Sequence, residues 1–372
     1  MKISRVAPLG AVAAIAALAL AGCSSTPASD PTSAPSSEAA APKVDASVKG
    51  TITAGGSSAQ ANAQTAWTAA FTSLATGVTV NYDKTLGSGG GRTNFLAGSL
   101  DFAGSDAPLS ADETTSAAAK FTGGAVNLPI YLDGVAVAYN SALGKDLNLS
   151  TETIAKIFSG KITDWSDAAI AKDNGGKALA AGKINVVVRS DSSGTATNFT
   201  NFLHAADAAD WTWPGSGTFP ADIPGVDAQK GGGAVATEVS KVPGSIGYLD
   251  HSALIDGVSA ATVDGIAFSN DAVAAALTAG GTSASNGVAG DLSMKFDYAK
   301  IKADTTAYPI PLLSYAIVPL AFANADNSAA TIEYLKFIAT PTGQKVAAAK
   351  AGSAPLPQSV LDSVQKTLAT VK

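Results

Sequence analysis

Apolar runs and short glycine- or serine-rich loops alternate along most of this chain, starting near Val48. Runs rich in β-branched and other apolar residues predict strands, which we place at 51–54, 78–82, 100–104, 127–140, 184–188 and 244–249. Apolar residues at helical spacing predict helices, which we place at 59–74, near 92–96, and at 150–158, 196–203, 234–239, 329–350 and 360–371. Because strands and helices alternate, the pattern predicts an α/β protein with mainly parallel sheets flanked by helices.

The long extended run at 127–140 divides this pattern into two predicted lobes. It carries the chain out of the first lobe, and the apolar stretch after Tyr308 leads back, because the C-terminal helices have no strand partner of their own. We therefore expect lobe I to comprise residues 48–128 and 308–372, and lobe II residues 129–307, joined by two crossover segments. With 372 residues, 46% of them hydrophobic, the chain is long enough for two cores.

The N-terminus follows a secretory pattern. Two basic residues, at positions 2 and 5, precede an apolar segment at 6–21 of the length found in signal sequences. The following Leu20-Ala21-Gly22-Cys23 resembles the bacterial lipobox, in which the cysteine becomes the first mature residue and carries the lipid. Cys23 is the only cysteine, so no internal disulfide can form. We expect residues 1–22 to be a signal peptide and the exported protein to be lipid-anchored at the outer face of the bacterial cytoplasmic membrane.

The residues after Cys23 are rich in serine, alanine and proline and predict a disordered tether at 23–47. The formal net charge is −6, and loss of Lys2 and Arg5 with the signal peptide changes it to −8. No basic stripe exists to neutralise a phosphate backbone, so we expect no nucleic-acid partner. A small anion can still bind, because oriented dipoles and one or two nearby cations act at short range.

The loop Arg189-Ser190-Asp191-Ser192-Ser193-Gly194-Thr195 joins the strand at 184–188 to a helical segment. The first N–H groups of a helix have no intrahelical partner, and the helix dipole adds positive potential there, so such a loop suits an oxyanion. Ser193 and Thr195 add hydroxyl groups, Gly194 permits a close backbone approach, and Arg189 adds a permanent charge. A capped turn with no ligand would have the same composition.

Three further loops follow strands in the same way. They are Gly55-Gly56-Ser57-Ser58, Gly87-Ser88-Gly89-Gly90-Gly91 and Ser105-Asp106. Their order and spacing, with Asp101-Phe102-Ala103-Gly104-Ser105-Asp106-Ala107-Pro108-Leu109 and the loop at 189–195 as the most specific matches, closely resemble the phosphate-binding proteins of bacterial phosphate ABC importers. Weaker support comes from the segments 157–165 and 243–248. The resemblance covers roughly residues 50–365 and implies a two-lobed type II periplasmic-binding-protein fold.

The resemblance also implies a set of ligand contacts between the lobes. In the first lobe these are Ser58, the backbone of Ala59, Ser88 and the carboxylate of Asp106; in the second they are Arg189, Ser193, Gly194 and Thr195, with Asp191 orienting Arg189. The family's first loop usually reads Gly-Ala-Thr-Phe, whereas here it reads Gly56-Ser57-Ser58-Ala59. The hydroxyl is therefore retained and the aromatic neighbour is lost.

Asp106 has a specific expected role. Phosphate near neutral pH keeps at least one O–H that can donate a hydrogen bond, whereas sulfate presents only acceptors. A buried carboxylate therefore accepts from phosphate and repels sulfate. Purely structural alternatives remain: Asp106 and Ser88 as helix caps, and Ser58 as a turn residue.

Other functions fit the sequence less well. A phosphatase-like enzyme would need metal ligands or an activated nucleophile, but His204 and His251 are the only histidines and neither lies in a ligand-spaced cluster. A binder of another oxyanion, such as sulfate or molybdate, would have no use for Asp106. We expect no catalytic activity, no cofactor, no metal and a monomer that delivers phosphate to the membrane permease of an ABC transporter. A further sensing or surface role stays open.

Overall fold

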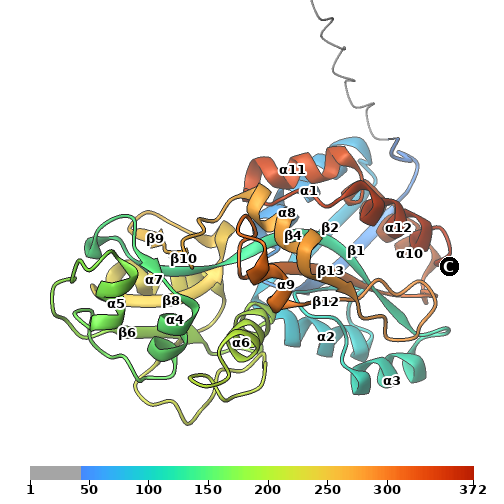
Figure 1. Ribbon diagram of the computed structural model, residues 1–372. Coiled ribbons are helices and arrows are strands. Elements are labelled where there is room, and N and C mark those ends of the chain that lie inside the picture. Colours follow the sequence, from blue (N-terminus) through green and yellow to red (C-terminus); the bar gives the residue numbers. More distant parts are fainter. Residues whose placement is uncertain (1–42) are drawn as a thin grey trace, which may run out of the picture. The chain divides into compact units, whose positions relative to one another are not determined.

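The computed structural model describes residues 43–372. The predictions for the signal peptide, for lipidation of Cys23 and for most of the tether lie outside these residues. Residues 43–47, at the end of the predicted tether, contact the folded part, because the backbone N–H of Asp45 donates to the Glu333 carboxylate at 2.9 Å. Figure 1 shows how the elements of the described residues are arranged.

The first lobe is built on four strands from both ends of the described chain. β2 (Val78–Asp83), β1 (Gly50–Gly56) and β3 (Phe102–Ser105) lie side by side in parallel, and β13 (Pro311–Pro319) follows β3 in the antiparallel direction. The helices of this lobe are α1 (Ala61–Leu74), α2 (Gly87–Ala97), α3 (Ala111–Lys120), α10 (Ala325–Ile338), α11 (Pro341–Ala351) and α12 (Gln358–Leu368).

The strand β4 (Ala125–Asn140) links the two lobes, and all of its residues are buried. Its residues 125–134 pair with β13, and its residues 135–140 pair with β8 (Ser245–Asp250) and β9 (Val258–Ala260), all in the antiparallel direction. In Figure 1 the green β4 runs from the sheet of β1 and β13 toward β8. One strand therefore belongs to both sheets.

The second lobe continues from β8 with β6 (Asn185–Arg189) and β7 (Asp227–Gln229), which are parallel. Its helices are α4 (Thr151–Phe158), α5 (Ala168–Asp173), α6 (Gly194–Ala206) and α7 (Gly232–Lys241), and β5 (Asn148–Leu149) pairs with β10 (Thr262–Val263). The chain then forms α8 (Asn270–Gly280), the pair β11 (Gly281–Ser283) and β12 (Met294–Phe296), and α9 (Tyr298–Ala303) before it returns to β13. Short 3₁₀ turns are η1 (Lys84–Leu86), η2 (Ser141–Leu143) and η3 (His251–Ala253).

The six predicted strands all exist, and each begins and ends within two residues of its predicted bounds. The prediction of a two-lobed α/β fold is confirmed, and antiparallel β13 and β4 make its sheets mixed. The glycines at 89–91 do not form a loop, because α2 already begins at Gly87. A Cβ on Gly91 would lie 2.6 Å from the Cα of Gly56, so this close approach of α2 to β1 requires glycine.

The single helix predicted at 329–350 is wrong. α10 ends at Ile338, and α11 begins at Pro341 after the N-cap Thr340, whose hydroxyl accepts from the backbone N–H of Gly343 at 3.0 Å. Proline lacks the N–H that a continuous helix would need, but at the first position of a new helix that donor is not required.

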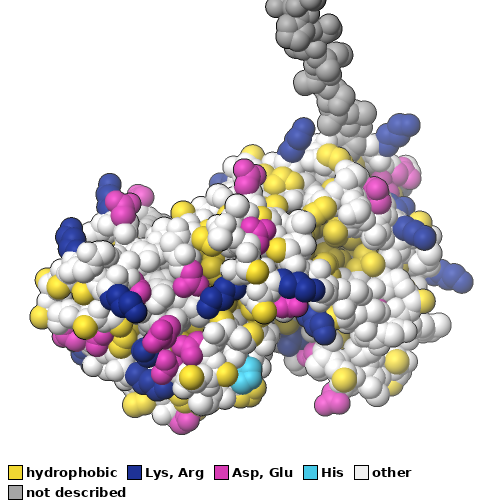
Figure 2. All heavy atoms as spheres, viewed as in Figure 1, with side chains coloured by type: hydrophobic (Ala, Val, Ile, Leu, Met, Phe, Trp, Pro, Cys, Tyr) yellow, Lys and Arg dark blue, Asp and Glu magenta, His cyan; other side chains and the backbone are white. Residues whose placement is uncertain are grey.

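Three further observations concern membrane-spanning helices, metal ligands and surface charge. Among residues 43–372 no helix is long and apolar enough to span a membrane, and no three His, Cys, Asp or Glu side chains are grouped to hold a metal ion. Acidic and basic side chains are interspersed on the face seen in Figure 2.

Candidate functional site between the lobes

Asp106, directly after β3, is the centre of a cluster of hydroxyl groups. Its side chain is buried, and its Oδ1 accepts hydrogen bonds from the hydroxyls of Ser57 and Ser314, the second at 2.6 Å. Its Oδ2 accepts longer hydrogen bonds from Ser88 at 3.4 Å and from Thr195 at 3.3 Å. Because the hydrogen bonds to Oδ2 are the longer ones, they are also the weaker ones. A ligand hydroxyl that donates to Oδ2 therefore replaces less hydrogen bonding than one that donates to Oδ1.

The pKa of Asp106 reflects both its burial and these donors. Burial raises the pKa of the Asp106 carboxyl, while the hydroxyls of Ser314 and Ser57 and the charge of Arg189 lower it. The donors stabilise the ionised form because an ionised carboxylate only accepts hydrogen bonds.

Arg189, the last residue of β6, contributes a buried positive charge. Its Nε and Nη2 donate to the two carboxylate oxygens of Asp191 at 2.8 and 2.6 Å, and the two side chains are 1% and 8% exposed. Its Nη1 is buried and has no hydrogen-bond partner within residues 43–372. Burial alone would raise the pKa of Asp191, but the hydrogen bonds and charge of Arg189 lower it below the usual value. Asp191 therefore holds Arg189 as an ion pair and leaves one guanidinium nitrogen to bind a ligand.

The first turn of α6 adds backbone donors beside this charge. The Ser193 hydroxyl is the N-cap and accepts from the backbone N–H of Ala196 at 3.1 Å. The backbone N–H groups of Gly194 and Thr195 precede the first intrahelical hydrogen bond, so they can donate to an anion at the positive end of the helix dipole.

The α6 turn lies directly against the loops of the first lobe. A Cβ on Gly194 would lie 2.6 Å from the Cβ of Asp106. The side-chain amide of Asn198 donates to the backbone carbonyl of Asp106 at 2.7 Å, and the backbone N–H of Gly89 donates to the carbonyl of Ser192 at 2.9 Å. Glycine at position 194 is therefore what permits this contact between the lobes.

The loop after β1 presents two serines in opposite directions. Ser57 is buried, donates to Asp106 and accepts from the backbone N–H of Ala59 at 3.1 Å. Ser58 is partly exposed, and its hydroxyl accepts from the backbone N–H of Gly232 in the second lobe at 3.3 Å. Ser57 thus supports the carboxylate, and Ser58 faces the cleft.

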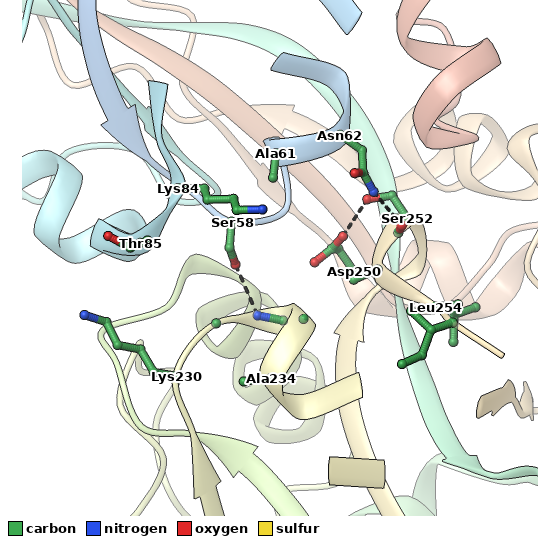
Figure 3. Close-up of a pocket in the computed structure, with 15 residues that line it drawn as sticks. Ser58, Ala61, Asn62, Lys84, Thr85, Lys230, Ala234, Asp250, Ser252 and Leu254 are labelled. Carbon is green, nitrogen blue, oxygen red and sulfur yellow. Dashed lines mark hydrogen bonds between the residues drawn. The ribbon is translucent and has the colours of Figure 1, made fainter. Parts of the chain in front are cut away.

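A cleft of about 450 Å³ opens beside Ser58 and is lined from both lobes, as Figure 3 shows. Its lining includes Ser58, Asn62 and Lys84 from the first lobe and the segment 230–234, Asp250 and Ser252 from the second. Gly231 joins the cleft to the Arg189 pair, since its backbone N–H donates to Asp191 at 3.0 Å.

The structure brings most of the predicted site residues together. Ser88, Asp106, Gly194 and Thr195 contact one another, Arg189 pairs with Asp191 as predicted, and Ser58 lies across from the start of α7. The Ser193 hydroxyl accepts a hydrogen bond as the helix cap and keeps its own O–H to donate, whereas the backbone N–H of Ser193 already donates to the Gly217 carbonyl at 2.9 Å.

Sequence reasoning missed four polar residues at this place: Ser57, Asn198, Asp250 and Ser314. One signal was present for Ser314, which is a lone polar residue in the apolar run of β13. Asn198 gave no signal, because a polar residue in a helix is usually exposed.

Two lobes that share the strand β4, with anion donors on one and a buried carboxylate on the other, define a two-lobed binding protein. The model of a family described as PBP superfamily domain matches residues 40–342. Phosphate-binding protein PstS 3 of Mycobacterium tuberculosis is 35% identical over 343 residues, which are 90% of this chain and 91% of that protein.

Solved structures show the same fold. The phosphate-binding protein of Stenotrophomonas maltophilia superposes with a TM-score of 0.67 at 24% identity and covers 85% of this chain and 93% of that one. A Clostridium perfringens structure, named as a candidate phosphate ABC transporter substrate-binding protein with bound phosphate, has a TM-score of 0.61 at 20% identity and covers 83% of this chain and 100% of that one. The chain belongs to the PBP superfamily and, within it, to the PstS family of phosphate-binding proteins, which confirms the resemblance seen in the sequence.

Proposed function

We propose that this protein captures inorganic phosphate between its two lobes and delivers it to the membrane permease of an ABC importer. One observation carries the proposal: Arg189 Nη1 and the first turn of α6 offer donors from the second lobe, while the Asp106 carboxylate offers an acceptor from the first lobe. This is the complement of a protonated tetrahedral oxyanion. The names of the relatives support phosphate as that anion.

The ligand contacts follow from the same geometry. Arg189, Gly194, Thr195 and the Ser193 turn bind oxyanion oxygens from the second lobe, and Ser88 and Ser58 bind from the first. The backbone N–H of Ala59, which donates to the Ser57 hydroxyl at 3.1 Å, would exchange that hydrogen bond for one to the ligand. Asp106 accepts the ligand's O–H, supported by Ser57 and Ser314. Selectivity against sulfate follows because sulfate would place an acceptor against the ionised Asp106.

The lobes we propose are those predicted from the sequence, with one refinement. The pairing of β4 changes from β13 to β8 between Gly134 and Val135, which moves the first crossover from residue 128 to that step. The segment after β11 contacts the first lobe, since the Asp291 carboxylate accepts from the backbone N–H of Asn127 at 2.8 Å. Closure about the two crossovers would bring the two sets of contacts onto the ligand.

We further propose that the mature protein begins at lipidated Cys23, acts outside the cytoplasm as a monomer and has no catalytic activity. The relatives are named as binding proteins, which supports the last point. Fractionation of cells that express the wild type and Cys23→Ala tests the anchor: the variant should leave the membrane fraction. Metal-dependent turnover of a phosphomonoester would contradict the non-catalytic role.

The decisive experiment is calorimetric titration of ligand-free protein with phosphate and then with sulfate. We expect tight, saturable phosphate binding and sulfate binding weaker by at least about 100-fold, because an unpaired buried acceptor costs about 1–3 kcal/mol and more for a charged group. Equal affinities would favour a general oxyanion binder, and absence of phosphate binding would reject the proposal.

A further inference from the structure

A second buried carboxyl group, Asp250 at the end of β8, faces the same cleft. Its residue is 1% exposed, and one oxygen, Oδ2, accepts from the Ser252 hydroxyl at 2.6 Å. The other, Oδ1, is buried and has no hydrogen-bond partner within residues 43–372. Figure 3 shows that oxygen directed into the cavity, on the side of Ser58. A buried acceptor without a donor is costly, so its persistence at a binding cleft points to a donor on the ligand.

The position of Asp250 relative to Ser58 fits a single small ligand. A Cβ on Gly232 would lie 2.8 Å from Asp250 Oδ1 and 3.9 Å from Ser58 Oγ, so both oxygens border the same space at the start of α7. A small ligand that hydrogen-bonds to Ser58 would therefore enter the space that Asp250 Oδ1 also borders.

The charged groups around Asp250 make additional negative charge at this end of the cleft unfavourable. The pKa of Asp250 is raised to about 6, mainly by burial and also by the charge of Asp106, while the Ser252 hydroxyl and Arg189 act in the opposite direction. Burial and the charge of Asp250 raise the pKa of the neighbouring Asp133, in β4, well above its usual range. The other titratable groups near this end of the cleft are Asp191, which is paired with Arg189, His251, whose pKa burial lowers to about 4, and the exposed Lys84 and Lys230 at the rim.

We propose that Asp250 provides a second proton position in the ligand site and thereby selects monobasic phosphate. Asp106 accepts from one P–OH and Asp250 accepts from a second, which only H₂PO₄⁻ carries. This proposal rests on the proposed phosphate-binding function and concerns the protonation state of the bound ligand. When the solution species is HPO₄²⁻, binding takes up one proton from the solvent: HPO₄²⁻ and H⁺ enter the site together, and the proton lies on the hydrogen bond between Asp250 and the ligand.

Calorimetric titration with inorganic phosphate in two buffers of different ionisation enthalpy measures this proton directly. We expect the wild type at about pH 8 to take up about one proton more per bound phosphate than Asp250→Asn does. We also expect Asp250→Asn to lose roughly tenfold in phosphate affinity at about pH 6 and much less at about pH 8.5, because the lost bond exists only with the second P–OH.

Asp256→Asn is the matched control, since Asp256 is exposed in the loop that follows the same strand. It should leave both the proton uptake and the pH dependence of the affinity unchanged. Equal proton uptake by the wild type and Asp250→Asn, with phosphate still bound, would overturn the role of Asp250. Absence of phosphate binding by the wild type would instead reject the proposed function.

A measurement on the wild type alone covers the case in which Asp250→Asn does not fold. The phosphorus NMR shift of protein-bound phosphate should stay constant from about pH 6 to about pH 8.5, while that of free phosphate moves as it loses its proton. A bound signal that moves with the free signal would overturn the proposal.

Discussion

The two lobes bring different chemistry to the proposed anion site. The second lobe offers positive charge and donors: Arg189, held by Asp191, and the first turn of α6. The first lobe offers a carboxylate, Asp106, surrounded by serine hydroxyls. In the proposed function, the second lobe attracts any oxyanion, and the first lobe admits only one that carries a proton.

This division of roles between the two lobes depends on which carboxylate pairs with Arg189. If Arg189 were paired with Asp106, both groups would be consumed in one ion pair and neither would be left for the ligand. Asp191 instead occupies two guanidinium nitrogens from within the same loop, and Asp106 takes its donors from hydroxyl groups. Attraction and selection can therefore be changed independently.

The largest expected effect comes from removing the charge of the second lobe. Arg189→Ala leaves the Asp191 carboxylate buried without its cation, so we expect at least about 100-fold weaker binding of phosphate and of sulfate alike. We also expect a loss of about 3–5 kcal/mol in the free energy of unfolding. Calorimetry and chemical denaturation measure the two effects.

The control for Arg189 is Lys161→Ala, which removes a cation from a pair with Asp210 in which the lysine side chain is 49% exposed. Such a surface pair contributes about 0–1 kcal/mol, so neither the affinity for oxyanions nor the free energy of unfolding should change much. Undiminished oxyanion binding by Arg189→Ala would show that the second lobe does not supply the attraction.

A smaller effect is expected where the two sides touch. Gly194→Ala places a methyl group 2.6 Å from the Asp106 Cβ, so the lobes cannot reach the same contact without a shift. Overpacking of this kind costs about 1–3 kcal/mol, so phosphate affinity should fall roughly tenfold or more. In Gly182→Ala, outside the cleft, the new methyl group would meet no atom within 4 Å, so titration of this variant should match the wild type.

The selectivity of the first lobe should change without loss of all binding. Asp106→Asn removes the charge that repels sulfate while it keeps the size of the side chain, so the ratio of phosphate to sulfate affinity should fall by about tenfold or more. The exposed Asp112→Asn serves as the control. An unchanged ratio would mean that Asp106 is structural.

The smallest expected effect is on the pH dependence of ligand-free stability, and it has opposite signs on the two sides. The raised pKa of Asp106 means that its stabilising contribution is present below about pH 3.8 and is lost as the pH rises through the folded-state pKa. The lowered pKa of Asp191 means that its contribution is present above that range and is lost as the pH falls.

As the pH increases from about 3 to about 7, the Tm of Asp106→Asn should therefore rise relative to the Tm of the wild type. Over the same range the Tm of Asp191→Asn should fall relative to the Tm of the wild type, each by a few °C. Thermal unfolding without ligand measures both. Slopes of the same sign would contradict the contrast between the two sides.

The sequence by itself determined where the predicted strands lie along the chain, the lobes in outline and the loops that carry the chemistry. Val186, Val187 and Val188 predict the strand before Arg189, and Ser193 predicts the helix start, because both signals lie within a few residues of what they specify. The pairing of Arg189 with Asp191, which the structure shows, was implied by the resemblance to the phosphate-binding proteins.

Only the tertiary structure decided which groups surround the anion site. Ser314 lies 208 residues from Asp106 along the chain, and Asn198 lies 92 residues away, so no local periodicity relates them. Adjacent residues after a strand face opposite sides. The sequence could not show which of Ser57 and Ser58 lies on the side of Asp106. The position of Asp250 could not be predicted from the sequence for the same physical reason. Its oxygen without a hydrogen-bond donor and its direction into the cleft depend on how β8, α7 and the loop after β1 pack together.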